Sequence, residues 1–286
     1  MKVFAFGEVL WDVYSNSEHI GGAPLNFAAH FKKCGGDASV ITAVGDDDLG
    51  KKTVSEIKKM GIGTEYITVS EKETGKCLVT LDENQIPSYN LLSDVAYDCI
   101  ESPIVTSRGV LYFGTLALRG ENNRKSLAKI IDSADFDDVF VDVNIRPPFY
   151  SDEVIKYALS NATIIKISDE ELPVIMSALG REDKDLSCVA TALSESFSKL
   201  KIIIITKGGD GSFVYDCKNR KIHECKAEKV SVVSTVGAGD SFSASFLAEY
   251  LRSADVKKAL SLATKVSGYV VSKKEAIPEY DINNFM

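Results

Sequence analysis

The sequence predicts one α/β domain over residues 1–286, with a mostly parallel central sheet, helices on both faces and a small β-sheet lid. Three observations support this fold class. Short β-branched runs alternate with segments of helical periodicity, which is the element order of parallel α/β proteins. Several runs, such as residues 202–205, are apolar throughout, as expected of strands covered on both faces. Two polar, strand-like segments interrupt the alternation.

The main sheet and its helices account for most of the chain. The strands are short and rich in β-branched residues, and we expect them at residues 2–7, 38–45, 109–114, 139–144, 163–168, 201–207 and 230–233. The helices carry apolar residues at helical spacing, and we expect them at residues 24–33, 49–60, 122–132, 151–158, 170–179, 238–251 and 256–271. No repeat or low-complexity linker divides these elements, which indicates one continuous architecture.

The two interrupting segments cover residues 13–20 and 76–92. They are too short and too polar to form a domain with its own core. We therefore predict that they pair as a small sheet laid across the mouth of the main domain. A lid of this kind excludes water during a group transfer.

Composition and charge exclude several classes of partner. Apolar residues make up 45% of the chain and charged residues 26%, close to an average globular protein. The formal net charge of −8 gives no general attraction to nucleic acid or to an anionic membrane surface. No segment approaches the roughly 18 uncharged apolar residues of a membrane span, and the N-terminus lacks the apolar run of a signal peptide. We expect a cytoplasmic protein whose six cysteines are free thiols.

The strongest motif is STVGAGDSF at residues 234–242, where a helix is predicted to begin. The small residues Gly237, Ala238 and Gly239 leave backbone N–H groups uncovered at the positive end of the helix, so an oxyanion can approach them. Asp240 follows in the first turn, where an acidic residue also suits a plain helix start. As a site, this carboxylate would take a hydroxyl proton while the amides hold developing negative charge.

A second motif, GGAPLNFAA at residues 21–29, places small residues at the mouth of another helix. Gly22 permits close approach of a ligand, and Asn26 offers both a donor and an acceptor. Asp12 follows the first strand, where α/β sheets bind ligands, although it also fits a solvated loop acid. A carboxylate beside a carboxamide suits the vicinal hydroxyls of a sugar.

These residues carry a family resemblance. Residues 21–45 and 235–247 closely resemble the two signatures of PfkB-type, ribokinase-like carbohydrate kinases. The segments GEVLWD at 7–12, VDVNIRPP at 141–148 and KISDEE at 166–171 look most like fructokinases. The resemblance spans essentially the whole chain. It implies a ribokinase-like three-layer sandwich that transfers the γ-phosphate of ATP to a hydroxyl of D-fructose.

The resemblance also implies roles for individual residues. Asp240 would be the general base, and the amides of Gly237, Ala238 and Gly239 would form the anion hole. The sugar would be bound by Asp12, Gly22, Asn26 and Arg146. The phosphates and ribose of ATP would be lined by Thr206, Lys207, Gly208, Gly209 and Gly211. Glu171 would organise the water shell of Mg²⁺.

Three departures from the family pattern qualify these roles. The family usually has Asn where Ser168 stands, which weakens the magnesium role of Glu171. It commonly has Asp at Ser234 and Gly at Glu275, both near a monovalent-cation site. We therefore expect turnover to depend on magnesium but little on potassium.

Other functions stay open at this point. A 2-keto-3-deoxygluconate kinase shares the type of segment at residues 144–146, and another PfkB sugar kinase would share both signatures. A sugar acid calls for an extra cation at the lid, and residues 87–92 contain none. A kinase-like sugar sensor would bind without transferring phosphate, but a pure binder does not need Asp240. A homodimer formed through the lid is also open.

Overall fold

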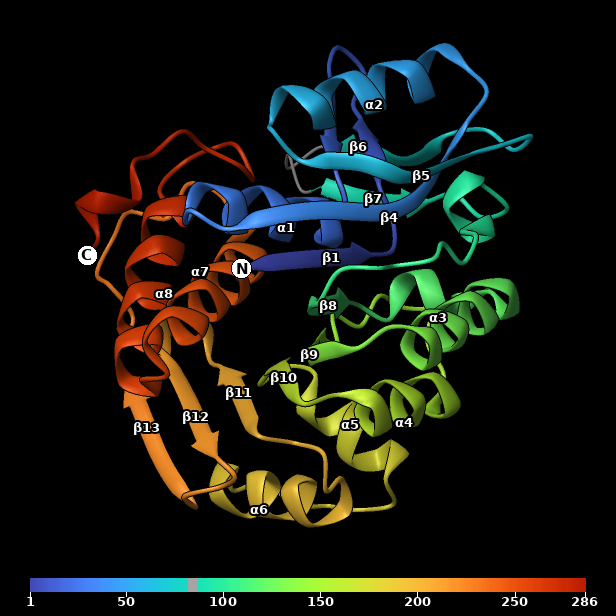
Figure 1. The fold of residues 1–286 in the computed structure, drawn as a ribbon. Helices are drawn as coiled ribbons and strands as arrows, with labels where there is room; N and C mark the ends of the chain where they lie inside the picture. Colours follow the sequence, from blue (N-terminus) through green and yellow to red (C-terminus); the bar gives the residue numbers. More distant parts are fainter. Residues whose placement is uncertain (82–86) are drawn as a thin grey trace.

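A nine-stranded sheet runs through the computed structural model, which describes residues 1–81 and 87–286 (Figure 1). Its strand order is β13-β12-β11-β10-β9-β8-β1-β4-β5, and only the pairings of β12 with β11 and with β13 are antiparallel. The strands are β1 (Lys2–Phe6), β4 (Asp37–Gly45), β5 (Gly63–Ser70), β8 (Gly109–Phe113), β9 (Phe136–Asp142), β10 (Ile164–Ser168), β11 (Ile202–Thr206), β12 (Ser212–Asp216) and β13 (Lys221–Cys225). The predicted mostly parallel sheet is confirmed.

Helices cover both faces of this sheet (Figure 1). One face carries α1 (Ala23–Lys33), α2 (Asp48–Lys59), α7 (Ala238–Ser253) and α8 (Val256–Val271). The other carries α3 (Glu121–Ser133), α4 (Asp152–Asn161), α5 (Leu172–Ala178) and α6 (Leu186–Ser196). Successive residues of a strand enter opposite cores: Val3 and Ala5 pack on the first face, and Phe4 and Phe6 on the second. This two-sided burial explains why strands such as β1 and β11 are largely apolar.

One predicted strand is wrong. Residues 230–233 form no strand and run as an irregular segment into α7. Val232 and Val233 are 64% and 55% exposed, so they are not packed into a sheet. The backbone N–H of Val233 instead donates to the carbonyl of Val271 at the end of α8 (2.8 Å). The β-branched composition predicted a strand, but the edge of the main sheet is already formed by β13.

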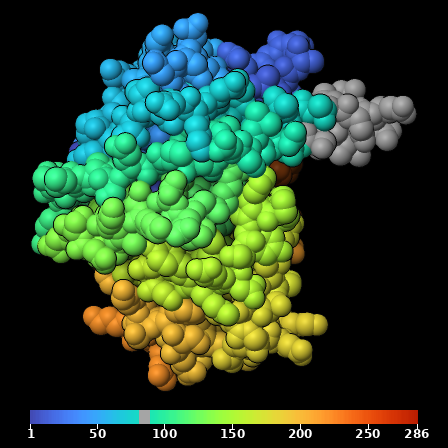
Figure 2. All heavy atoms as spheres, turned by 90° about the vertical axis from the view of Figure 1, so that its right-hand side faces the viewer, coloured from blue at the N-terminus to red at the C-terminus, as the bar shows by residue number. Residues whose placement is uncertain are grey.

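A second, four-stranded sheet has the order β3-β2-β6-β7, with β2 (Leu10–Val13), β3 (Glu18–Gly21), β6 (Gly75–Leu81) and β7 (Pro87–Leu91). The predicted small sheet is thus confirmed, although residues 82–86 of the segment 76–92 lie outside the described residues. We call this four-stranded sheet the lid sheet. Because β2 begins at Leu10, Asp12 lies on a lid strand and not in a loop after β1. In the space-filling view, blue to cyan residues of the N-terminal part lie above the green and yellow residues from the middle of the chain (Figure 2).

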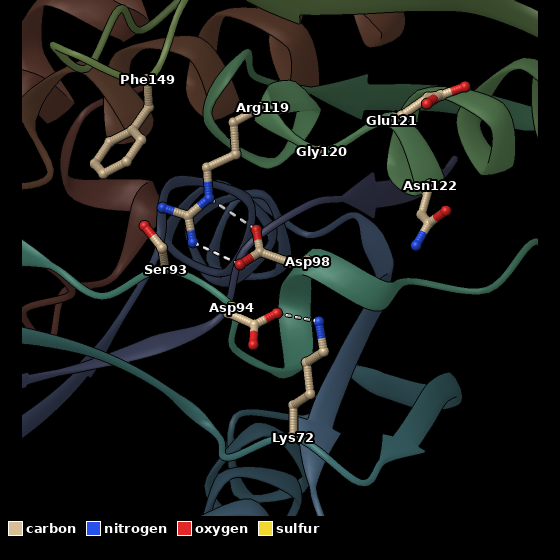
Figure 3. Close-up of a pocket in the computed structure, with 9 residues that line it drawn as sticks. All are labelled: Lys72, Ser93, Asp94, Asp98, Arg119, Gly120, Glu121, Asn122 and Phe149. Carbon is tan, nitrogen blue, oxygen red and sulfur yellow. Dashed lines mark hydrogen bonds and ion pairs between the residues drawn. The ribbon is translucent and has the colours of Figure 1, made fainter.

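The lid sheet is tied to the body by a charged cluster beside a cavity of about 430 Å³ (Figure 3). Arg119 binds both carboxylate oxygens of Asp98 (2.7 and 2.8 Å) and the carbonyl of Leu92, which directly follows β7 (2.8 Å). The rings of Tyr97 and Phe149 lie 5.0 and 4.7 Å from its guanidinium carbon. None of the predicted site residues lines this cavity.

This cluster gives a prediction for stability. Arg119 and Asp98 expose only 9% and 12% of their side chains, so Arg119→Met leaves a carboxylate largely buried without its partner. We expect the free energy of unfolding in urea to fall by about 3 kcal/mol. Arg108→Met is the control, because its pair with Asp137 is exposed and should be worth less than about 1 kcal/mol. Equal losses in the two variants would contradict the prediction.

No helix among residues 1–81 and 87–286 combines the length and the apolar character that crossing a membrane requires. The six cysteines are free thiols, as predicted.

Candidate active site

Most predicted site residues lie at the carboxyl edge of the parallel strands, where α/β sheets bind ligands. Arg146 follows β9, Ser168 ends β10 and Thr206 ends β11. Thr206 pairs with Ser168 across β10 and β11, so the segment from 206 to 211 starts at this edge. The N-terminus of α7, which carries Asp240, lies at the same edge, over β10.

The two sequence motifs meet in a hydrogen bond. Asn26 on α1 donates from Nδ2 to Oδ2 of Asp240, in the first turn of α7, at 2.8 Å. These residues are 214 positions apart in the chain, and they meet because α1 and α7 pack on the same face of the sheet. Asn26 is 5% exposed, so its carboxamide holds the Asp240 carboxylate in a fixed orientation.

The start of α7 is shaped by glycines. Gly237 has a left-handed φ of +79°, and a Cβ there would lie 2.5 Å from the carbonyl oxygen of Ala276. The N–H of Ala238 already donates to the carbonyl of Thr235 (3.2 Å). In the described part of the chain, the N–H groups of Gly237 and Gly239 have no such backbone partner. The amides open to an oxyanion are therefore those of the two glycines, and the Ala238 amide is engaged elsewhere. We call the backbone N–H groups of Gly237 and Gly239 the anion cradle.

A buried ion pair lies directly beneath the anion cradle, and sequence reasoning gave it no role. Lys166 on β10 binds Oδ1 of Asp142 on β9 at 3.1 Å, and Ser243 on α7 donates to the other carboxylate oxygen at 3.1 Å. A Cβ on Gly239 would lie 3.1 Å from the Lys166 Nζ, so the ammonium touches the cradle. Lys166 and Asp142 are only 7% and 1% exposed. The signal in the sequence is a lysine inside an otherwise apolar strand.

The charges around Asp240 set its proton affinity. Burial raises its pKa to about 6, and the nearby Asp142 carboxylate adds to the rise, while Asn26, Lys166 and Arg146 oppose it. Burial lowers the pKa of Lys166, but the surrounding carboxylates, Asp142 first, leave it raised overall, so this residue stays cationic. Asp240 can therefore exchange a proton near neutral pH beside a permanent positive charge.

A second group of predicted residues faces the site from the lid side. Asp12 lies against Gly21, where a Cβ would come within 3.3 Å of its Oδ2. Gly22 has φ +110°, and a Cβ there would meet the Glu8 carbonyl oxygen at 2.3 Å, so the backbone is tightly packed. Burial raises the pKa of the Glu8, Asp12 and Asp240 carboxyls, and the positive charge of the exposed Arg146 opposes the rise in all three. The structure thus brings both motifs and Arg146 to one place.

The segment predicted to bind nucleotide forms an open turn. Gly208 and Gly209 are exposed, and a Cβ on either would touch nothing within 4 Å. Gly211 is buried, with φ +100°, while Lys207 donates its N–H to the Gly211 carbonyl (2.8 Å). The backbone of this turn is accessible beside Thr206.

Glu171 has a structural task in addition to its predicted one. Its Oε1 accepts from the N–H of Ile145 (2.6 Å), and its Oε2 accepts from the N–H of Ser168 (2.7 Å). It thereby ties the loop before Arg146 to the end of β10. Among the described residues, no three His, Cys, Asp or Glu side chains converge to hold a metal ion directly.

Comparisons with known proteins fit this arrangement. Residues 2–283 match the sequence model of the pfkB family carbohydrate kinases. The chain is 26% identical to fructokinase of Escherichia coli, with 96% of this chain and 95% of the relative covered. It is 25% identical to 5-dehydro-2-deoxygluconokinase of Bacillus thuringiensis, with 94% and 86% covered. A sugar kinase of Pyrococcus horikoshii, solved in complex with ATP, superimposes with a TM-score of 0.83 at 27% identity, covering 99% and 96%.

Proposed function

Because the chain belongs to the pfkB family of carbohydrate kinases, we propose that it is an ATP-dependent fructokinase that phosphorylates the primary hydroxyl of D-fructose. The observation that carries this proposal is the Asp240 carboxylate, fixed by Asn26 at 2.8 Å beside the anion cradle. Fructokinases among the relatives of the chain support the choice of sugar.

We assign Asp240 as the general base. Its carboxylate takes the proton of the attacking hydroxyl as the new O–P bond forms, and the bond from the γ-phosphorus to ADP breaks on the opposite side. The N–H groups of Gly237 and Gly239 and the Lys166 ammonium stabilise negative charge on the transferred group. Asn26 keeps the base in its orientation throughout.

The nucleotide side of the site suits ATP. A polyphosphate needs a Cβ-free cradle and a cation, and Gly237, Gly239 and Lys166 supply them. Next to the cradle we place the rest of ATP along the open turn formed by Thr206, Lys207, Gly208, Gly209 and Gly211. Mg²⁺ would be held by the ATP phosphates and by water, with Glu171 at the edge of that water shell, and would neutralise phosphate charge.

The sugar side favours a neutral polyol over a sugar acid. Asp12 and Asp240 face the site with Arg146, whose charge is shared with both carboxylates and with Glu8. The carboxylate of a sugar acid would be repelled by these three carboxylates, and the positive charge of Arg146 is already shared among them. Hydroxyl groups, in contrast, can donate to Asp12 and accept from Arg146.

A coupled ADP-release screen tests the substrate. Fructose, mannose, ribose, nucleosides and keto-deoxy sugar acids are compared at saturating ATP, with the Asp240→Asn protein as the blank for contaminating kinases. We expect fructose to have the highest kcat/KM, and ³¹P NMR to place the phosphate on a primary hydroxyl. A sugar acid or a nucleoside turning over at least about tenfold better would overturn the fructose assignment. Sugar binding without ADP release would indicate the sensor instead.

The raised pKa of Asp240 predicts that activity falls on the acidic side of the pH profile. The base acts only when deprotonated, so below its pKa of about 6 the kcat/KM for the sugar should fall about tenfold per pH unit. The rate is measured from pH 5 to 8 at constant ionic strength. Glu8→Gln is the control, because it removes a neighbouring carboxyl whose pKa burial raises to about 7. The role of Asp240 would be contradicted if kcat/KM did not change with pH. It would also be contradicted if the fall at acidic pH disappeared in Glu8→Gln.

A further inference from the structure

His30 lies on the same face of α1 as Asn26, one turn further along the helix. It is fully buried, and both ring nitrogens are engaged. Nε2 lies 2.9 Å from the carbonyl oxygen of Ala276, and Nδ1 lies 2.8 Å from the hydroxyl of Tyr280. α1 therefore contacts the start of α7 through Asn26 and the C-terminal segment through His30.

The partners of His30 determine its tautomer. A carbonyl oxygen only accepts hydrogen bonds, so Nε2 carries the proton and donates to Ala276. Nδ1 then accepts from the Tyr280 hydroxyl. Burial lowers the pKa of His30 to about 4, which keeps the ring neutral near pH 7. The ring of Tyr280 stacks on it, with centroids 5.7 Å apart and planes inclined by 13°.

Ala276 is the link between His30 and the anion cradle. Its backbone packs against Gly237: a Cβ there would lie 2.5, 2.9 and 3.0 Å from the Ala276 oxygen, Cα and carbonyl carbon. The carbonyl oxygen that His30 holds is thus the atom nearest to that position. A shift of this carbonyl would release the packing that supports the left-handed turn at Gly237.

We propose that His30 is a positioning residue of the anion cradle, which fixes the Ala276 carbonyl through Nε2 and thereby holds the Gly237 amide in place. With Asn26, this gives α1 two tasks. It orients the base at one end of the cradle and secures the backbone donor at the other. The proposal rests on the anion cradle of the proposed function, but not on the identity of the sugar.

The test compares three variants, using the sugar that the parent phosphorylates best. His30→Gln can place an amide donor near the position of Nε2, His30→Asn cannot reach it, and Tyr280→Phe leaves the Nε2 bond intact. For His30→Asn we expect kcat to fall about tenfold or more with the sugar KM within about threefold, as for a lost transition-state interaction. His30→Gln and Tyr280→Phe should keep at least about a third of the parental kcat, even where the melting temperature falls.

Other outcomes overturn the proposal. The positioning role is wrong if His30→Asn keeps a kcat within about threefold of His30→Gln, or if Tyr280→Phe loses as much kcat as His30→Asn. If His30→Asn does not fold, His30→Met replaces it, since Met fills a similar volume and has no donor. If neither folds while the other two variants do, His30 acts in folding and not in positioning. Unchanged kcat in both Gly237→Ala and Asp240→Asn would instead refute the cradle itself.

Discussion

Asp240→Asn is expected to lower kcat by about 10²–10⁴ while both substrates still bind. A sugar hydroxyl is a weak nucleophile, and its proton must leave as the O–P bond forms. Asn has nearly the same shape as Asp and can still pair with Asn26, but it cannot accept this proton. The KM values for fructose and ATP should stay within a few-fold of the parent, which is the pattern of lost transition-state stabilisation.

The Asp240→Asn protein should be folded and at least as stable as the parent. The folded state raises the pKa of Asp240 from 3.8 to about 6, so it binds the proton more tightly than the unfolded chain does. At pH 7 the ionised carboxylate therefore costs folding free energy, and Asn removes this cost. Asp12→Asn is the matched control and should mainly raise the sugar KM. If Asp240→Asn keeps more than about a tenth of the parental kcat with chemistry rate-limiting, Asp240 is not the base.

Lys166→Met is expected to have the second-largest effect, with kcat lowered by about 10²–10³. The ammonium lies against Gly239 in the anion cradle, where negative charge develops during transfer. The same substitution leaves the Asp142 carboxylate buried and unpaired, which should cost about 3–5 kcal/mol of unfolding free energy. Activity and stability therefore have to be separated.

The double variant Lys166→Met with Asp142→Asn separates them. It replaces the ion pair by neutral groups, so most of the lost stability should return, while kcat stays low. Lys201→Met is the control for removing a lysine from an ion pair, because Lys201 pairs with Asp138 outside the site and is 52% exposed. A double variant with more than about a tenth of the parental kcat would show that Lys166 has only a structural role.

The sequence pattern was sufficient to predict the parallel sheet and the lid segments, and the family resemblance implied that the two motifs meet. Apolar strands such as β11 reveal burial on both faces, and the glycines before Asp240 reveal a helix start open to an anion. The strand predicted at residues 230–233 does not form, and this has a physical reason. β-branched residues favour extended backbone, but only neighbouring strands decide whether a segment joins a sheet.

The residues that sequence reasoning missed depend on contacts between distant parts of the chain. Lys166 acquires its partner only because β9 and β10 pair in the register that sets it opposite Asp142. His30 reaches Ala276, 246 positions later, only because the C-terminal segment packs beside α1. The Ala238 amide looked free from its position in the motif, but the turn at Thr235 engages it. Local patterns do not specify such pairings.

A crystal structure with fructose, ADP and a planar aluminium fluoride bound as a transition-state mimic would test the assignment of this site most directly. We expect the primary hydroxyl of fructose to lie roughly 2.6–3.2 Å from the Asp240 carboxylate, the distance of a hydrogen bond to a general base. The fluoride should accept from the N–H groups of Gly237 and Gly239 and lie beside Lys166. Fructose bound elsewhere, or fluoride away from the start of α7, would contradict the assignment of this site.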